Sequence, residues 1–287
     1  MDSNDQLLQR AARLIDRLEQ LINPSPTPTD WDHIAFRWRR GLGLQPVARP
    51  HEIALGDLLC MARQKAEIVR NTQQFVAGYS ANNVLLWGSR GTGKSSLIKA
   101  VLNEFADRGL RLVEVEKHDL IDLPDIVEQF YQRPERFVLF CDDLSFEADD
   151  ASYKSLKAVL DGSVAAPPEN VLIYATSNRR HLLPEYQREN LEARLIDEEI
   201  HHGEGVEEKI SLSERFGLWL SFYPFNQMQY LQIVDHWLVA FDVAKVTETD
   251  QSIREAALQW ALKRGSRSGR VAWQFARDWA GRLHAGS

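Results

Sequence analysis

The sequence predicts an α/β protein in which helices cover both faces of a parallel sheet. Strand-like apolar runs alternate with helix-like segments between residues 84 and 175, which is the order of a three-layer α/β protein. A glycine-rich segment joins the first of these runs to the first helix, and two later runs end abruptly in polar residues. Ligands of such folds bind at the carboxyl ends of the strands, so these segments also predict where the functional site lies.

Residues 1–47 are predicted to form an N-terminal helical extension followed by a proline-rich linker. Apolar residues recur at helical spacing from Gln6 to Ile22, and three prolines follow between residues 23 and 29. Aromatic residues and arginines are interleaved between Trp31 and Arg40. They indicate either a contact with nucleic acid or a partner, or aromatics that dock back onto the domain. We favour docking, and we place the start of the main domain at Ala48.

The main domain is expected to span residues 48–224, and a helical segment from Ile53 to Phe75 precedes its first strand. The run from Val84 to Trp87 is apolar enough to be a buried strand, and residues 96–102 predict a helix. Between them stands the pattern G-x-x-x-x-G-K-S. It consists of Gly88, Ser89, Arg90, Gly91, Thr92, Gly93, Lys94 and Ser95, with Ser96 directly after it.

This spacing predicts a phosphate-binding loop, or P-loop, at the N-terminus of a helix. Unpaired N–H groups and the positive end of the helix dipole favour a polyanion there, and the glycines keep Cβ atoms away from phosphate oxygens. Lys94 would reach the β- and γ-phosphates of ATP. The hydroxyl of Ser95 would coordinate the Mg²⁺ that bridges them. Residues 88–96 are therefore the predicted site for ATP and Mg²⁺.

A second polar group of residues follows the apolar strand from Phe137 to Cys141, which ends at Asp142 and Asp143. Two carboxylates at this edge of a sheet are expected to meet a cation or a network of water. Asp142 is the predicted partner of Mg²⁺ through water, and Asp143 is predicted to orient and polarise the attacking water. The alternative is a pair of solvated aspartates that only open a loop.

The other predicted core elements are a strand around residues 110–115, helices around 125–131 and 153–160, and a strand from Val171 to Ala175. The last strand leads into a polar segment that contains Asn178. If this strand lies beside the Asp142 strand, Asn178 can hydrogen-bond both the attacking water and the γ-phosphate.

Two segments follow the core. Residues 185–208 are acidic and contain His201 and His202, whose spacing favours a solvated loop over a metal site. This segment is also a candidate insertion that contacts a partner. Residues 225–287 predict a lid domain of three helices. Its tryptophans are interpreted as core residues of the bundle: Trp237, Trp260, Trp273 and Trp279.

Composition excludes some classes of protein. A net charge of -7 and an isoelectric point near 5.7 argue against a protein that coats nucleic acid, although they leave room for local basic patches. No run approaches the about 18 apolar residues of a membrane span, and the first residues lack the pattern of a signal peptide. The two cysteines form no disulfide framework. The sequence predicts a cytoplasmic protein without membrane contact.

The motifs occur in the order that AAA+ ATPases show. The P-loop, Asp142-Asp143 and Asn178 match Walker A, Walker B and sensor 1, and residues 213–216 (SERF) and 269–272 (GRVA) resemble the arginine finger and sensor 2. The strings FVLFCDDLSFE, LKAVLDGSV, YATSNRRHLLPE and LSERFGLWLSFYPF resemble a bacterial AAA+ family catalogued as domain of unknown function 815. This similarity covers about residue 50 to the C-terminus.

The resemblance implies roles for two arginines. Arg215 would be the arginine finger, which reaches across a subunit boundary to stabilise charge on the transferring phosphoryl group, and it therefore implies a homo-oligomer. Arg270 would be sensor 2, which contacts the γ-phosphate and reports its loss to the lid, with Arg267 as a nearby rival. Most AAA+ proteins end Walker B with Asp-Glu. Because Asp143 is one methylene shorter, slow hydrolysis is expected unless the backbone compensates or Glu147 moves in.

Three functions are open. The favoured one is an oligomeric ATPase that remodels or loads a protein or nucleoprotein partner. The alternative is a slowly hydrolysing, nucleotide-gated binding protein of the helicase-loader type. A small-molecule kinase would use the same P-loop, but a long lid with an arginine at its start argues against it. No Asn-Lys-x-Asp element for reading guanine occurs in the chain, so a GTPase is disfavoured.

Overall fold

The computed structural model describes residues 29–146, 150–162, 168–180, 182, 194–196, 199–201, 212–243 and 251–285. The predicted helix from Gln6 to Ile22, Glu147 and most of the acidic segment 185–208 lie outside these residues. None of the described helices combines the length and the hydropathy that a bilayer crossing needs.

In the described part of the chain, one sheet of seven strands forms the centre of the main domain, with the order β2-β1-β4-β5-β6-β3-β9. All neighbouring strands are parallel except β1 and β2, which are antiparallel. The strands are β1 (Ala35–Arg39), β2 (Gly43–Pro46), β3 (Val84–Gly88), β4 (Leu110–Glu114), β5 (Arg136–Cys141), β6 (Val171–Ser177) and β9 (Leu218–Phe222). A separate antiparallel pair, β7 (Arg194–Ile196) and β8 (Glu199–His201), lies in the acidic segment.

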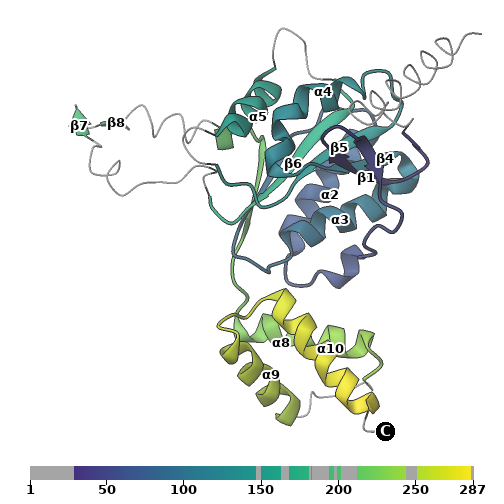
Figure 1. Ribbon diagram of the computed structural model, residues 1–287. Coiled ribbons are helices and arrows are strands. Elements are labelled where there is room, and N and C mark those ends of the chain that lie inside the picture. The colour runs from purple at the N-terminus through teal and green to yellow at the C-terminus, as the bar shows by residue number, and fades with distance from the viewer. Residues whose placement is uncertain are drawn as a thin grey trace, which may run out of the picture.

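Helices cover both faces of the sheet, as the alternation of the sequence predicts (Figure 1). The helices α2 (Ala62–Val76) and α3 (Lys94–Phe105) pack on one face through a core that contains Ile68, Leu97 and Leu86. On the other face, α4 (Leu123–Glu128) and α5 (Ala151–Asp161) share a core with Leu85 and Leu139. The shorter 3₁₀ helices are η1 (Leu55–Asp57), η2 (Ala106–Arg108) and η3 (Lys117–Asp122).

The start of the main domain differs from the predicted boundary at Ala48, because β1 and β2 are strands of its sheet. The alternation of Phe36 and Trp38 with arginines is that of an amphipathic strand. Both aromatic side chains are buried, and Arg37 and Arg39 form ion pairs with Glu114 and Glu116 at 2.7 and 2.8 Å. The aromatics therefore dock onto the domain, as favoured, and they do so as part of the sheet.

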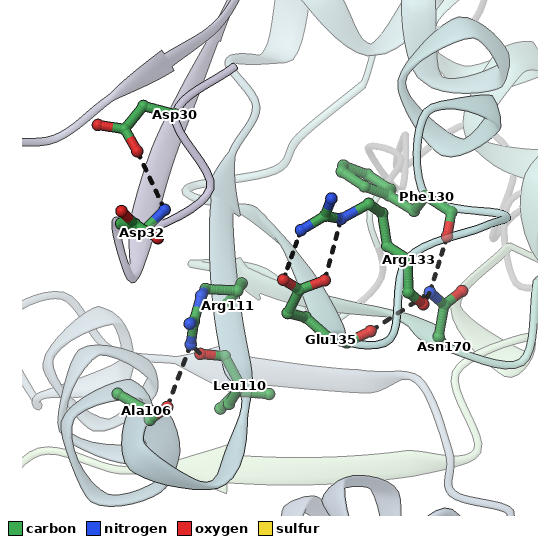
Figure 2. A network of polar contacts seen from close by, with 9 residues as sticks. All are labelled: Asp30, Asp32, Ala106, Leu110, Arg111, Phe130, Arg133, Glu135 and Asn170. Carbon is green, nitrogen blue, oxygen red and sulfur yellow. Dashed lines mark hydrogen bonds and ion pairs between the residues drawn. The ribbon is translucent and has the colours of Figure 1, made fainter. Parts of the chain in front are cut away.

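The turn that leads from α4 into β5 is held by a small polar network (Figure 2). Asn170 donates from its Nδ2 to the carbonyl oxygens of Phe130 and Arg133 at 2.8 and 3.0 Å. Arg133 in turn donates to both carboxylate oxygens of Glu135, at 3.0 and 2.6 Å. These contacts fix the start of β5, and β5 carries the two acidic residues at its other end.

The described residues of the lid contain three helices, as the sequence predicts: α8 (Gln227–Ala240), α9 (Gln251–Lys263) and α10 (Gly269–Ala285). A capping box starts α8, in which Asn226 Oδ1 accepts from the Gln229 backbone and Gln229 Oε1 accepts from the Asn226 backbone, at 2.9 and 3.0 Å. Small buried residues such as Ala257, Ala272 and Ala276 let the helices pack closely. Figure 1 shows the lid as a separate bundle joined to the core after β9.

Candidate functional site

The loop between β3 and α3 has the backbone that the glycine spacing predicts. Gly88 and Gly93 have φ angles of 129° and 97°, a region that residues with side chains rarely adopt. A Cβ on Gly88 would lie 2.0 Å from the carbonyl oxygen of Phe222, which also accepts from the Ser89 backbone at 3.0 Å. Gly93 is the N-cap of α3, a helix of twelve residues, so the loop ends at a helix N-terminus. This arrangement leaves room for phosphate oxygens beside backbone N–H groups.

Lys94 lies at the centre of the site. Its ammonium donates to the carbonyl oxygens of Gly88 and Ser89 at 2.8 and 2.9 Å and to Asn178 Oδ1 at 3.2 Å. Burial lowers the pKa of Lys94, and the carboxylates of Asp143 and Asp142 oppose that shift. The side chain therefore joins the P-loop to the polar residues that follow β6.

The acidic residues after β5 meet the P-loop and the end of β6. Ser95 Oγ donates to Asp142 Oδ1 at 2.6 Å, and Asn178 Nδ2 donates to Asp143 Oδ1. This arrangement follows from the pairing of β5 with β6, in which Cys141 lies opposite Ala175. The strand before Asn178 is thus the neighbour of the strand before Asp142, which is the arrangement that a role of Asn178 in the site requires. The two aspartates do not merely open a solvated loop.

A cavity of about 790 Å³ lies between the core and the lid and includes these polar residues. Its polar part includes Arg90, Lys94, Asp142, Asp143, Thr176, Asn178 and Arg270, and its apolar part includes Leu58, Met61, Phe225, Ile233, Trp237 and Trp273. The apolar wall comes from three separate segments of the chain. Apolar walls with a few convergent polar groups are typical of small-molecule sites.

Sequence reasoning missed the apolar wall. All four tryptophans of the lid are predicted to be core residues. Trp237, Trp260 and Trp279 do pack against that core, but Trp237 and Trp273 also line the cavity, whereas Trp260 and Trp279 do not. Their helical spacing contains no signal that separates the two pairs. The separation depends on which turn of α8 and α10 faces the core, which is a property of the folded molecule.

The two candidate arginines of the lid differ in position. Arg270 lines the cavity, and its backbone N–H donates to the carbonyl oxygen of Gly91 at 3.3 Å. Ser268 is buried against the same glycine, where a Cβ on Gly91 would lie 2.8 Å from the Ser268 hydroxyl. Arg267 is exposed and is not among the lining residues. The start of α10 therefore touches the P-loop directly.

Arg215 lies apart from the cavity of its own chain. It follows a helical turn at residues 212–214 and donates from its Nε to Asp161, the last residue of α5. Its side chain is half-buried and is absent from the lining of the cavity. Whatever Arg215 does for phosphate chemistry, this position does not bring it to the P-loop of the same chain.

The residues present fit Mg²⁺ with its usual oxygen ligands. The hydroxyl of Ser95 and the carboxylate of Asp142 are already within hydrogen-bonding distance, so one small cation could contact both groups. Mg²⁺ is commonly held by one or two carboxylates together with substrate phosphates and water. Within the described residues, no group of three or more His, Cys, Asp or Glu side chains offers a complete cage of protein ligands.

Comparison with known proteins finds a matching family and several solved structures with a similar fold. Residues 31–283 match the family described as "Protein of unknown function (DUF815)". None of the curated proteins matches the chain.

Among solved structures, a mutant of RuvB from Thermotoga maritima has a TM-score of 0.50 at 15% identity, covering 78% of this chain and 63% of that chain. The replication initiator DnaA, bound to AMPPCP and single-stranded DNA, gives 0.48 at 18% identity, with coverages of 76% and 60%. The Aeropyrum pernix ORC1 protein in complex with DNA gives 0.43 at 12% identity, with coverages of 76% and 65%. The chain spans less than two thirds of each of these structures.

The family match extends over most of the chain, from just before β1 to the last turn of α10. RuvB is an AAA+ P-loop ATPase, and its likeness in fold covers 78% of this chain. The chain therefore belongs to the DUF815 family and has the fold of an AAA+ P-loop NTPase.

Proposed function

We propose that the protein is an ATPase that binds Mg²⁺-ATP in the cavity between core and lid and hydrolyses it within a homo-oligomer. The observation that carries this proposal is the convergence of Lys94, Ser95, Asp142, Asp143 and Asn178 at one end of the cavity. Donors for phosphate, ligands for a cation and a base for water are the three requirements of phosphoanhydride hydrolysis.

Each of these residues has a role that its contacts support. The Lys94 ammonium is held at the loop carbonyls and would neutralise charge on the β- and γ-phosphates. The Asp143 carboxylate would accept a proton from the attacking water, and Asn178 restrains it by donating to Oδ1. When bound at Ser95 and Asp142, Mg²⁺ would polarise the phosphate oxygens.

The apolar wall suits the nucleobase, because flat aromatic rings stack on side chains such as Trp237 and Trp273. Base and phosphates together would contact both the core and the lid. Arg270 would then sense the γ-phosphate, since it stands in the cavity wall beside Gly91. Loss of that phosphate would be passed to the lid as a change in its position.

An oligomer is proposed because Arg215 is placed away from its own cavity. Its partly exposed side chain, bonded to Asp161 at the end of α5, would reach the cavity of a second copy. There it would stabilise charge that develops on the transferring phosphoryl group, a contribution of about a thousandfold or more in rate. The work done by such an assembly would be to remodel or load a protein or nucleoprotein partner in the cytoplasm.

One observation favours the alternative of a slowly hydrolysing, nucleotide-gated binding protein. The acidic residues among those that line the cavity are Glu52, Asp57, Asp142 and Asp143. Asp143 is the one joined to Asn178, and its carboxylate is one methylene shorter than the glutamate usual at this position. An error of about 1 Å in the position of a catalytic group can cost on the order of a hundredfold in rate.

The decisive test is phosphate release from Mg²⁺-ATP as a function of protein concentration, for the wild type and Arg215→Ala. We expect a specific activity that rises with concentration and falls about a thousandfold in the variant, because the finger acts in trans. Arg254→Ala is the matched control, since Arg254 is an exposed arginine of α9. A flat, very low rate in both the wild type and Arg215→Ala would favour the nucleotide-gated binding protein.

A further inference from the structure

The turn after β5 is held in place by the last residues of β6. The Asp143 backbone N–H donates to Thr176 Oγ1 at 2.8 Å, and the Leu144 N–H donates to the Thr176 carbonyl at 2.7 Å. Ser177 Oγ adds a third contact by donating to the Leu144 carbonyl at 2.8 Å. Thr176 is 1% exposed, so water does not compete for its hydroxyl. The neighbouring strand therefore fixes the backbone that carries both acidic residues.

The hydroxyl of Thr176 connects the two acidic residues. Its oxygen accepts from the Asp143 N–H, which leaves its single proton to be donated, and that proton goes to Asp142 Oδ1 at 2.6 Å. The same carboxylate oxygen also accepts from Ser95 Oγ. If Ser95 turns to bind a cation, Thr176 still holds Asp142. A single buried hydroxyl thus restrains one residue through its backbone and the other through its carboxylate.

Asp143 needs such a restraint because its backbone is left-handed, with a φ of 53°. For a residue with a side chain this region is less favourable than the ordinary conformations, although aspartate tolerates it better than most. The direction of the Asp143 carboxylate depends on this backbone angle. The bond from Asp143 N–H to Thr176 is a contact that opposes its relaxation.

We propose that Thr176 is a positioning residue that orients the two carboxylates of the site, Asp142 toward the cation and Asp143 toward the attacking water. This inference rests on the proposed function of the cavity. It explains how aspartate can serve where glutamate is usual. The left-handed turn and its hydrogen bond to Thr176 determine the position of the Asp143 carboxylate. Ser177 is equally buried and also supports the turn, but its hydroxyl bonds to backbone atoms, the Leu144 carbonyl oxygen and the Arg179 N–H.

The test compares Thr176→Val, which keeps the shape and removes the hydroxyl, with Thr176→Ser, which keeps the hydroxyl. We expect Thr176→Val to lower kcat about 10- to 100-fold with a change in KM below about threefold, while Thr176→Ser stays within about threefold of wild type. The second readout is nucleotide affinity with and without Mg²⁺. Thr176→Val is expected to lose most of the Mg²⁺-dependent gain in affinity, and Thr176→Ser is expected to keep it.

Thr72→Val is the matched control, because Thr72 is a fully buried threonine of α2 whose hydroxyl bonds Ile68 and Tyr174 away from the cavity. It is expected to lower the melting temperature without changing the Mg²⁺ dependence. Wild-type kcat and Mg²⁺ dependence in Thr176→Val would overturn the inference. Equal losses in Thr176→Val and Thr176→Ser would also overturn it, since they would indicate a structural role for the residue.

The two proposals can fail separately. A wild type that binds nucleotide but releases no phosphate would contradict the proposed hydrolysis, and the Mg²⁺ dependence of affinity in the two Thr176 variants would still decide the inference. A wild type that binds no nucleotide would overturn both. Turnover in the wild type together with an unchanged Thr176→Val would overturn the inference alone.

Discussion

Asp143 combines a left-handed backbone with a carboxylate held by Asn178. Both features support a role in which the position of this carboxylate matters more than its charge alone. The sequence predicts the acid and its neighbour on the adjacent strand, because both follow buried strands. It does not predict the backbone angle, since Asp-Leu after an apolar run is compatible with many turns.

At the scale of this residue we predict that Asp143→Asn keeps nucleotide binding and traps ATP. An amide retains the shape and can still face Asn178, but it cannot take a proton from water, so turnover should fall about 100- to 10,000-fold. Binding of a fluorescent ATP analogue and single-turnover phosphate release measure the two properties.

The companion variant is Lys94→Ala, which is expected to lose binding because the ammonium at the loop carbonyls is removed. Continued turnover in Asp143→Asn would exclude this carboxylate as the base. Wild-type affinity for ATP in Lys94→Ala would contradict the assignment of the loop itself.

Among the elements, β5 is a buried strand whose start is fixed by polar contacts in the turn that precedes it. Burial alone would raise the pKa of Glu135, but the hydrogen bond and charge of Arg133, together with its own backbone N–H, lower that pKa below the ordinary value of 4.5. The pair is contributed by residues only two positions apart, and Asn170 holds the same turn (Figure 2).

We predict that Glu135→Gln lowers the free energy of unfolding at pH 7 by about 1 kcal/mol, the value typical of a partly exposed ion pair. Because the folded pKa of Glu135 is lowered, its contribution is complete above the unfolded pKa of about 4.5 and is lost as pH falls through the folded pKa. Urea unfolding between pH 3 and 7 should therefore show two curves that converge in acid.

Glu128→Gln is the control for this experiment, because Glu128 is an exposed carboxylate at the end of the neighbouring α4. It should leave the pH dependence unchanged. A difference between wild type and Glu135→Gln that stays constant down to pH 3 would contradict the ion pair as its cause.

The elements of the core could be predicted from the sequence, and the reason is their strong local signal. Buried parallel strands such as β5 and β6 are continuous apolar runs, and the helices between them show helical spacing. The strands β1 and β2 could not, because β1 resembles any short segment of alternating aromatics and arginines. Its place in the sheet, between β2 and β4, is decided by pairing with both of these strands.

For the whole molecule, the cavity between core and lid is the feature that no local signal predicts. Its apolar wall joins Met61, Ile233 and Trp273, which are separated by most of the chain. Apart from Thr176, which lies inside β6, the polar residues of the cavity that follow a strand or open a helix were predictable. The apolar wall of this cavity forms only when the core and the lid pack together, so no single segment of the sequence indicates it.

At this scale we predict that nucleotide binding changes tryptophan fluorescence through Trp237 and Trp273. Replacing Trp273 by Ala should weaken binding of ADP about 10- to 100-fold, corresponding to about 1–3 kcal/mol for the loss of one base-stacking contact. Trp260→Phe is the control, because Trp260 packs in the lid beside Phe275 and does not line the cavity.

Titration of each variant with ADP measures affinity and signal together. A fluorescence change that disappears in Trp260→Phe and persists in Trp273→Ala would mean that the nucleotide acts on another part of the lid. Unchanged affinity in Trp273→Ala would remove this side chain from the binding site.

The pairing of β1 with β4 also has a consequence for how the protein is made. Arg37 and its partner Glu114 are 77 residues apart, so β1 leaves the ribosome well before the strand it joins has been synthesised. During that interval Phe36 and Trp38 have no sheet to cover them, while Arg37 and Arg39 keep the segment charged. Charged side chains on a strand that is still unpaired discourage its pairing with other chains. The two arginines thus have two successive roles. Before the sheet forms, their charge keeps the β1 segment soluble, and afterwards they pair with Glu114 and Glu116.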